Sequence, residues 1–308
     1  MSGWPPARHA NKMHGMNALL PPTPTTRTLT LRGRRHRLLH WGDSDAPMLF
    51  LLHGWMDCAE TFSFIAEDLA RDWQLVAPDW RGFGHSQWND GPYFFPDYLA
   101  DLDALLEALS PTTPARIAGH SMGAMIAGLY AGARPERVAR LALMEGFGLN
   151  ATEPGQAPGR YARWLAEQRT APAFQAPASQ EALAARLLAR NPRMHAEHAR
   201  LMARALTRDV DGALAYRADP WHKGVNPVLY RLEEAKACWR AITCPVLWVI
   251  GGDEGEHPMA KGVQATLDAR RACFARLSEV TVADAGHMLQ WEQPAAVAAT
   301  LAGFFAQG

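Results

Sequence analysis

The sequence of 308 residues predicts an α/β fold: a mostly parallel, eight-stranded sheet with helices on both faces and an inserted helical cap. Short apolar, β-rich runs alternate with longer stretches of helical periodicity, which favours parallel strands joined by helical crossovers. The alternation stops over residues 151–230, which are rich in alanine and arginine and contain no isoleucine, a composition typical of helix. We therefore expect a flexible segment at 1–25, a core formed by 26–150 and 231–308, and a cap at 151–230.

Each expected element follows from a local pattern. The stretch 26–42 is typical of a hairpin, and the continuous apolar run at 48–54 is typical of a strand buried on both faces. Pro96 and Asp97 suit the first turn of a helix, which needs no proline N–H and favours a negative charge. The expected strands are 26–33, 34–42, 48–54, 74–80, 115–121, 138–146, 244–252 and 279–286. The expected helices are 58–70, 96–110, 122–135, 231–242, 259–275 and 294–307.

Composition excludes several classes of protein. Hydrophobic residues make up 48% and charged residues 20% of the chain, which is typical of a globular protein. The 31 basic residues balance the 31 acidic ones, so we expect no nucleic-acid partner. No apolar run is long enough to span a membrane, and the proline-rich N-terminus lacks a secretory pattern. The four cysteines show no zinc spacing. We expect a cytoplasmic protein without a metal, and its oligomeric state stays open.

The strongest chemical signal is Gly119-His120-Ser121-Met122-Gly123, at a predicted strand-to-helix junction. A serine in this G-x-S-x-G pattern lies on a sharp turn that exposes its hydroxyl above the sheet, and the two glycines allow strand and helix to approach closely. A serine hydroxyl needs a base to take its proton. The pattern predicts Ser121 as a nucleophile.

The base and its carboxylate follow from chain order, which for this serine turn is Ser, then Asp or Glu, then His. After the cap only His257 and His287 are available, and His287 follows the last predicted strand in the sequence DAGH. Asp253 directly follows the strand at 244–252, so we expect the triad Ser121, His287 and Asp253. Glu145, at the end of the strand at 138–146, is the alternative acid.

The loop after the third strand, His53-Gly54-Trp55, is the expected second half of an oxyanion hole. Backbone N–H groups of Trp55 and Met122 would stabilise the negative charge of a tetrahedral intermediate. We expect His53 to brace this loop by hydrogen bonds, and the sequence DWRGFGHS at 79–86 to form a structural turn. Trp80, Phe83, Met288 and Trp291 either line an apolar substrate pocket or belong to the core, and the core is the simpler expectation for each; His120 is a further candidate for the pocket.

Together these motifs resemble the α/β-hydrolases with a cap, over roughly residues 26–307. The pattern is similar to serine hydrolase-like proteins, esterases and carbon–carbon bond hydrolases. It differs from epoxide hydrolases and haloalkane dehalogenases, which attack with an aspartate where this chain has Ser121. The resemblance implies a cofactor-free serine hydrolase, most simply a carboxylesterase for small or medium acyl substrates. A lactone or diketone hydrolase with the same triad, side-activity in perhydrolysis, and a ligand receptor on the same fold are the alternatives.

Overall fold

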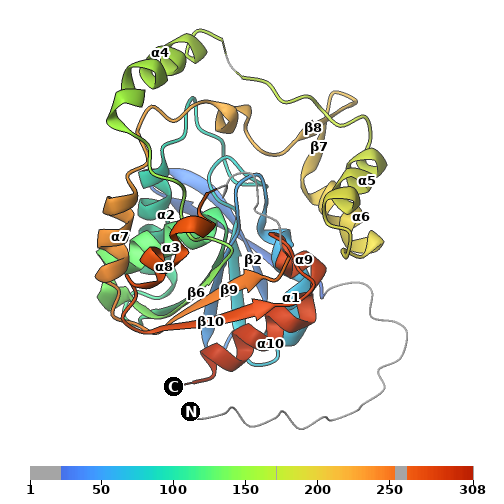
Figure 1. The fold of residues 1–308 in the computed structure, drawn as a ribbon. Coiled ribbons are helices and arrows are strands. Elements are labelled where there is room, and N and C mark those ends of the chain that lie inside the picture. Colours follow the sequence, from blue (N-terminus) through green and yellow to red (C-terminus); the bar gives the residue numbers. More distant parts are fainter. Residues whose placement is uncertain (1–21, 171, 254–261, 308) are drawn as a thin grey trace.

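The computed structural model describes residues 22–170, 172–253 and 262–307. It contains an eight-stranded sheet in the order β1-β2-β4-β3-β5-β6-β9-β10 (Figure 1). The predicted fold class is therefore confirmed. Residues 1–21 of the segment expected to be flexible lie outside the described residues, and Thr25 already belongs to the first strand.

The strands lie close to the predicted positions, and so do the core helices, except for a short helix at Leu289–Glu292 that the sequence did not predict. The strands of the sheet are β1 (Thr25–Leu31), β2 (Arg34–Trp41), β3 (Met48–Leu52), β4 (Gln74–Pro78), β5 (Ala115–His120), β6 (Val138–Met144), β9 (Val246–Gly251) and β10 (Leu277–Val282). The core helices are α1 (Ser63–Leu69), α2 (Phe95–Leu109), α3 (Met122–Ala133), α7 (Leu232–Arg240), α8 (Leu267–Arg271), α9 (Leu289–Glu292) and α10 (Pro294–Phe305).

The sheet is parallel except at one edge. β1 pairs with β2, and β2 with β4, in antiparallel fashion, while the strands from β4 to β10 are parallel neighbours. The hairpin expected at 26–42 is therefore present. Because the carboxyl ends of the parallel strands meet at one edge of the sheet, the loops after β3, β5, β6 and β9 lie together there.

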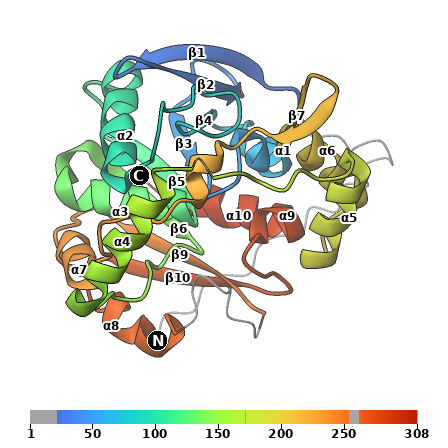
Figure 2. The same ribbon diagram turned by 90° about the horizontal axis from the view of Figure 1, so that it is seen from above.

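Helices cover both faces of the sheet (Figure 2). On one face α2, α3 and α7 pack over a core that contains Phe50, Ile117 and Trp248. On the other face α1 and α10 pack over a second core that contains Leu49 and Leu51. Alternate residues of β3 thus belong to opposite cores, which explains why its sequence is apolar throughout.

One predicted helix is shorter than expected. The pattern at 259–275 predicts one helix, but the structure forms a 3₁₀ turn at Gln264–Thr266 followed by α8. Residues 254–261, which include the alternative histidine His257, lie outside the described residues.

The segment 151–230, here called the cap, lies above the carboxyl edge of the sheet (Figure 1). It contains α4 (Ala157–Glu167), α5 (Gln180–Arg190) and α6 (Ala196–Ala205), and also a hairpin of β7 (Thr207–Val210) and β8 (Ala213–Tyr216). The composition of this segment predicts helix alone, so the hairpin differs from the expectation. Asp211 and Gly212, both at positive φ, are the Asp-Gly signal of a two-residue hairpin turn.

An aromatic contact anchors one side of the cap to the core. The His222 ring stacks between Phe83 and Tyr93, with ring centroids 3.8 Å apart in both pairs. Burial lowers the pKa of His222 to about 3, so the ring is neutral at physiological pH. The Tyr93 hydroxyl donates a hydrogen bond of 2.7 Å to Asp219, which belongs to the cap.

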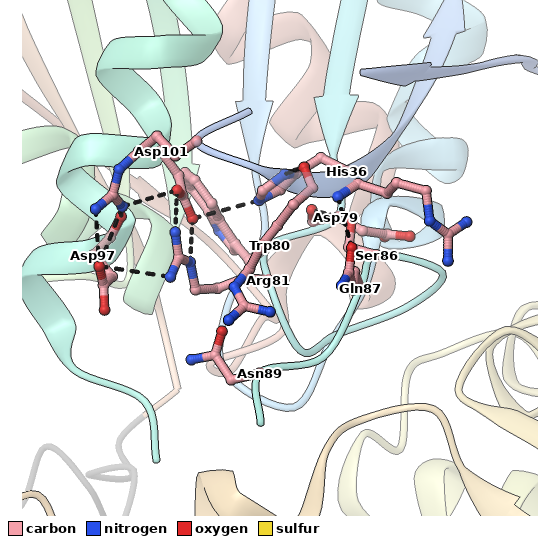
Figure 3. A network of polar contacts seen from close by, with 12 residues as sticks. His36, Asp79, Trp80, Arg81, Ser86, Gln87, Asn89, Asp97 and Asp101 are labelled. Carbon is pink, nitrogen blue, oxygen red and sulfur yellow. Dashed lines mark hydrogen bonds and ion pairs between the residues drawn. The ribbon is translucent and has the colours of Figure 1, made fainter. Parts of the chain in front are cut away.

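The turn at 79–86 is held by buried polar contacts, as expected of a structural element (Figure 3). Asp79 accepts hydrogen bonds from Arg37 Nε at 2.6 Å and from the His85 N–H at 2.8 Å. Arg81 donates two bonds of 2.5 Å to Asp101 of α2. These contacts fix the chain between β4 and α2 beneath the cap.

Candidate active site

Ser121 lies on the sharp turn that joins β5 to α3. Its backbone adopts φ 50° and ψ −115°, a conformation that L-residues rarely take. The Ser121 N–H donates to the Met144 carbonyl at 2.8 Å, which ties the turn to the end of β6. Such a strained turn between strand and helix is the backbone geometry that the G-x-S-x-G pattern predicts.

The two glycines of the motif are required by close backbone packing. A Cβ added at Gly119 would lie 2.6 Å from the Ala124 nitrogen, and one at Gly123 would lie 2.1 Å from the Leu52 carbonyl oxygen. Side chains at either position would therefore push α3 away from β3 and β5 and move the serine.

His287 is hydrogen-bonded through both ring nitrogens. Its Nε2 lies 3.1 Å from Ser121 Oγ, and its Nδ1 lies 3.3 Å from Glu145 Oε2. An ionised carboxylate only accepts hydrogen bonds, so Nδ1 carries the proton and Nε2 accepts from the serine hydroxyl. The structure thus brings Ser121 and His287 together, as the sequence predicts.

Glu145 is the carboxylate at His287, and it follows β6. Its N–H donates to the Val249 carbonyl at 3.1 Å, and its backbone adopts φ 50°. The Gly251 N–H donates to Glu145 Oε1 at 2.8 Å, leaving Oε2 for His287. One carboxylate oxygen is therefore fixed by the backbone of β9 while the other faces the imidazole.

Asp253 does not contact His287, which differs from the expectation. Its two carboxylate oxygens each accept a hydrogen bond of 2.8 Å from Arg193 of the cap. The physical reason is the direction of the chain after β9: the Asp253 N–H bonds to the Ala285 carbonyl at 3.0 Å, and the side chain turns toward the cap. Glu145, the alternative in the sequence, occupies the position expected for Asp253.

The loop after β3 packs against the serine turn. A Cβ added at Gly54 would lie 3.1 Å from Ser121 Cβ, so the loop backbone passes directly beside this serine. His53 braces the loop as expected: its Nε2 accepts from the Trp80 N–H at 3.0 Å, and its Nδ1 donates to the Gly54 carbonyl at 2.7 Å. Burial lowers the pKa of His53, which keeps the ring neutral in this role.

Asp57, four residues after His53, is a buried carboxyl group that the sequence analysis did not single out. The residue is 5% exposed, and its Oδ1 accepts a hydrogen bond of 2.9 Å from the Cys58 N–H. Burial raises the pKa of Asp57 to about 7. No sequence pattern distinguishes it from a loop aspartate, because the burial arises from packing.

A cavity of about 790 Å³ lies between the serine turn and the cap. Among the predicted pocket residues, His120, Met288 and Trp291 line it, as does Trp55. Trp80 and Phe83 do not: they are 1% and 0% exposed and belong to the core beneath the turn at 79–86. The cap contributes wall residues as well, namely Leu187, Arg190, Asn191 and Pro192.

Two further observations concern the described residues alone. Within 22–170, 172–253 and 262–307, no group of three or more His, Cys, Asp or Glu side chains could hold a metal ion. No helix in the same ranges is long and apolar enough to cross a membrane.

Comparison with known proteins identifies the family. The family model for the alpha/beta hydrolase fold matches residues 47–294, so the chain belongs to this family. A serine hydrolase-like protein of Dictyostelium discoideum is 28% identical over 263 residues, which cover 80% of this chain and 72% of that protein. A serine hydrolase-like protein of Danio rerio is 38% identical over 115 residues, which cover 37% of this chain and 35% of that protein.

Solved structures agree with this fold. A hypothetical protein of Pseudomonas aeruginosa superimposes with a TM-score of 0.78 at 27% identity, covering 91% of this chain and 98% of that one. A thioesterase domain from the curacin biosynthetic pathway superimposes with a TM-score of 0.80 at 24% identity, covering 91% and 99%. A carboxylesterase from Bacillus subtilis shares the fold at 19% identity with a TM-score of 0.63, covering 94% of each chain. The protein is therefore an α/β-hydrolase with serine hydrolase-like relatives.

Proposed function

We propose that the protein is a serine hydrolase that cleaves esters of small or medium acyl groups through an acyl-enzyme. The observation that carries the proposal is the hydrogen-bonded series Ser121, His287 and Glu145 at the floor of the cavity. In this proposal Glu145, not Asp253, is the acid of the triad. The substrate is a small molecule, and the reaction needs no cofactor.

The proposed reaction has two halves. In the first, His287 Nε2 takes the Ser121 proton as Oγ attacks the ester carbonyl, and the imidazolium then gives this proton to the departing alkoxide. In the second, His287 takes a proton from water, the resulting hydroxide attacks the acyl-enzyme, and the proton returns to Oγ as the acid leaves. The Glu145 carboxylate stabilises each imidazolium that forms.

The backbone N–H groups of Trp55 and Met122 are the proposed oxyanion hole. Met122 is the first residue of α3, where N–H groups have no partner within the helix. Trp55 follows Gly54, whose backbone lies beside Ser121. Donors fixed in this way stabilise the intermediate without reorganisation during the reaction.

The apolar side chains that line the cavity favour a substrate with an apolar part. Leu187 of the cap and Phe147, Val263 and Trp291 of the core contribute apolar side chains to its wall. Ester cleavage at Ser121 would place the acyl or alcohol chain against these groups, and the cap would then influence which chain lengths are accepted.

Labelling of the serine tests the proposal. Wild-type protein should react with a fluorophosphonate probe and hydrolyse a panel of p-nitrophenyl esters of increasing chain length. Ser121→Ala should lose labelling. Its rate should be at most about 10³–10⁴ times that of the uncatalysed reaction in water, which is the residual catalysis of a site without its nucleophile. Circular dichroism should show that the variant is folded. Equal labelling of the alanine variant, or no turnover of any ester by the wild type, would refute the function.

A further inference from the structure

We propose that Glu292 and Arg193 are positioning residues for His287, so that the cap takes part in holding the catalytic base. This inference rests on the proposed function of His287. Neither residue contacts the reacting atoms in this scheme, and both act through the backbone that precedes the histidine.

Glu292 holds the residue next to His287. The Gly286 N–H donates a hydrogen bond of 2.7 Å to Glu292 Oε2. The side chain of Glu292 is only 3% exposed, although Glu292 is the last residue of α9 and lines the cavity. A second carboxylate is close, because a Cβ added at Gly286 would lie 3.4 Å from both Glu292 Oε2 and Asp253 Oδ2.

Two carboxylates that converge on one backbone position need a cation. Burial of an uncompensated carboxylate is costly, and two like charges repel each other. Arg193 supplies the positive charge: its guanidinium binds both oxygens of Asp253 at 2.8 Å, and its Nη1 lies 3.7 Å from Glu292 Oε2. The Arg193 N–H also donates to Glu292 Oε1 at 3.4 Å.

Arg193 lies in the cap, between α5 and α6. A path of direct contacts therefore runs from the cap through Glu292 to the Gly286 N–H, one residue before the base. The side chains of Arg193 and Asp253 are 34% and 36% exposed, and ion pairs with this exposure contribute little to stability. Loss of the contact should therefore change the position of the histidine loop more than the stability of the fold, and the contact is lost if the cap moves away.

Paired variants test this proposal. Arg193→Ala should lower kcat about tenfold with little change in KM, since small displacements of a catalytic group reduce rate rather than binding. Glu292→Gln, which keeps an oxygen for the Gly286 N–H, should retain more activity than Glu292→Ala. In a Glu292→Gln background, Arg193→Ala should have a much smaller effect than in wild type. Arg200→Ala, which removes a cap arginine paired with Glu197, is the matched control.

A spectroscopic readout separates this proposal from the proposed function. The His287 Nδ1–H proton should give a low-field NMR resonance that shifts or broadens in Arg193→Ala and stays unchanged in Arg200→Ala. This measurement needs no substrate, so it remains decisive even if no ester is hydrolysed. An unchanged resonance in Arg193→Ala, or strictly additive effects of the Arg193 and Glu292 substitutions, would overturn the positioning role.

Discussion

The ends of β6 and β9 look alike in sequence and behave differently in the structure. Each strand is parallel, buried and followed by an acidic residue in a glycine-containing turn: Glu145 precedes Gly146, and Asp253 follows Gly252. Glu145 is 16% exposed and faces His287, whereas Asp253 is 36% exposed and binds Arg193. The difference shows that position after a strand brings an acid to the site but does not decide what it contacts.

The two turns differ in how the chain leaves the strand. Glu145 takes a left-handed conformation immediately after β6, and the Gly251 N–H from the neighbouring strand fixes one of its oxygens. Asp253 comes two residues after the end of β9 and bonds through its backbone to Ala285. Its side chain is therefore left at the cavity rim, within reach of the cap.

The largest expected effect comes from neutralising Glu145. Glu145→Gln removes the charge that stabilises the imidazolium and allows the wrong tautomer of His287. The equivalent change in a serine protease costs about 10⁴ in kcat, so we expect a loss of about 10³–10⁴ in ester turnover. The kcat of each protein is measured with a saturating p-nitrophenyl ester, after circular dichroism has shown that the variant is folded. A variant that keeps most of its turnover would exclude Glu145 as the triad acid.

Asp253→Asn should have a much smaller effect. It weakens the bidentate pair with Arg193 without touching His287, so we expect kcat to fall by at most about tenfold. The same assay, run beside Glu145→Gln, makes the comparison direct. If Asp253→Asn were the more damaging of the two, the contacts of the two carboxylates in the working enzyme would be the reverse of those described above.

A third carboxyl group, Asp57, differs from Glu145 and Asp253 because we expect it to affect the stability of the protein rather than its catalytic rate. Its folded-state pKa of about 7 lies above its ordinary value of 3.8. Between these pKa values the folded protein keeps a proton on Asp57 that the unfolded chain releases. The contribution of Asp57 to the free energy of unfolding therefore falls as pH rises from about 4 to about 7, and it does not change further above about pH 7.

Asp57→Asn should remove that pH dependence. The free energy of unfolding of the variant relative to wild type should increase by about 2–4 kcal/mol between pH 4 and pH 8, since one pKa unit corresponds to about 1.4 kcal/mol. Denaturant unfolding of both proteins at several pH values measures the difference. Parallel stability profiles would show that Asp57 is charged in the folded protein at neutral pH.

Local patterns in the sequence predicted the fold, and chain order predicted the contact between Ser121 and His287. The eight strands followed from apolar runs bounded by turn residues, and the serine turn followed from two glycines around Ser121. The missed hairpin in the cap had its own local signal, Asp211-Gly212, which the helical composition of the surrounding segment outweighed. Trp80 and Phe83, for which the sequence left pocket and core open, belong to the core, because an aromatic residue after a strand can face either the cavity or the core.

What the sequence determined by itself are the features set by neighbours along the chain: strand and helix periodicity, the turn that exposes Ser121, and the loop that carries His287. The tertiary structure alone decided which acid faces the histidine and which cap residue reaches the other acid. These contacts join residues such as Glu145 and His287 that are 142 positions apart. They depend on the strand order and on the turn after each strand, because parallel strands bring several acids to one edge and small backbone differences then aim each side chain.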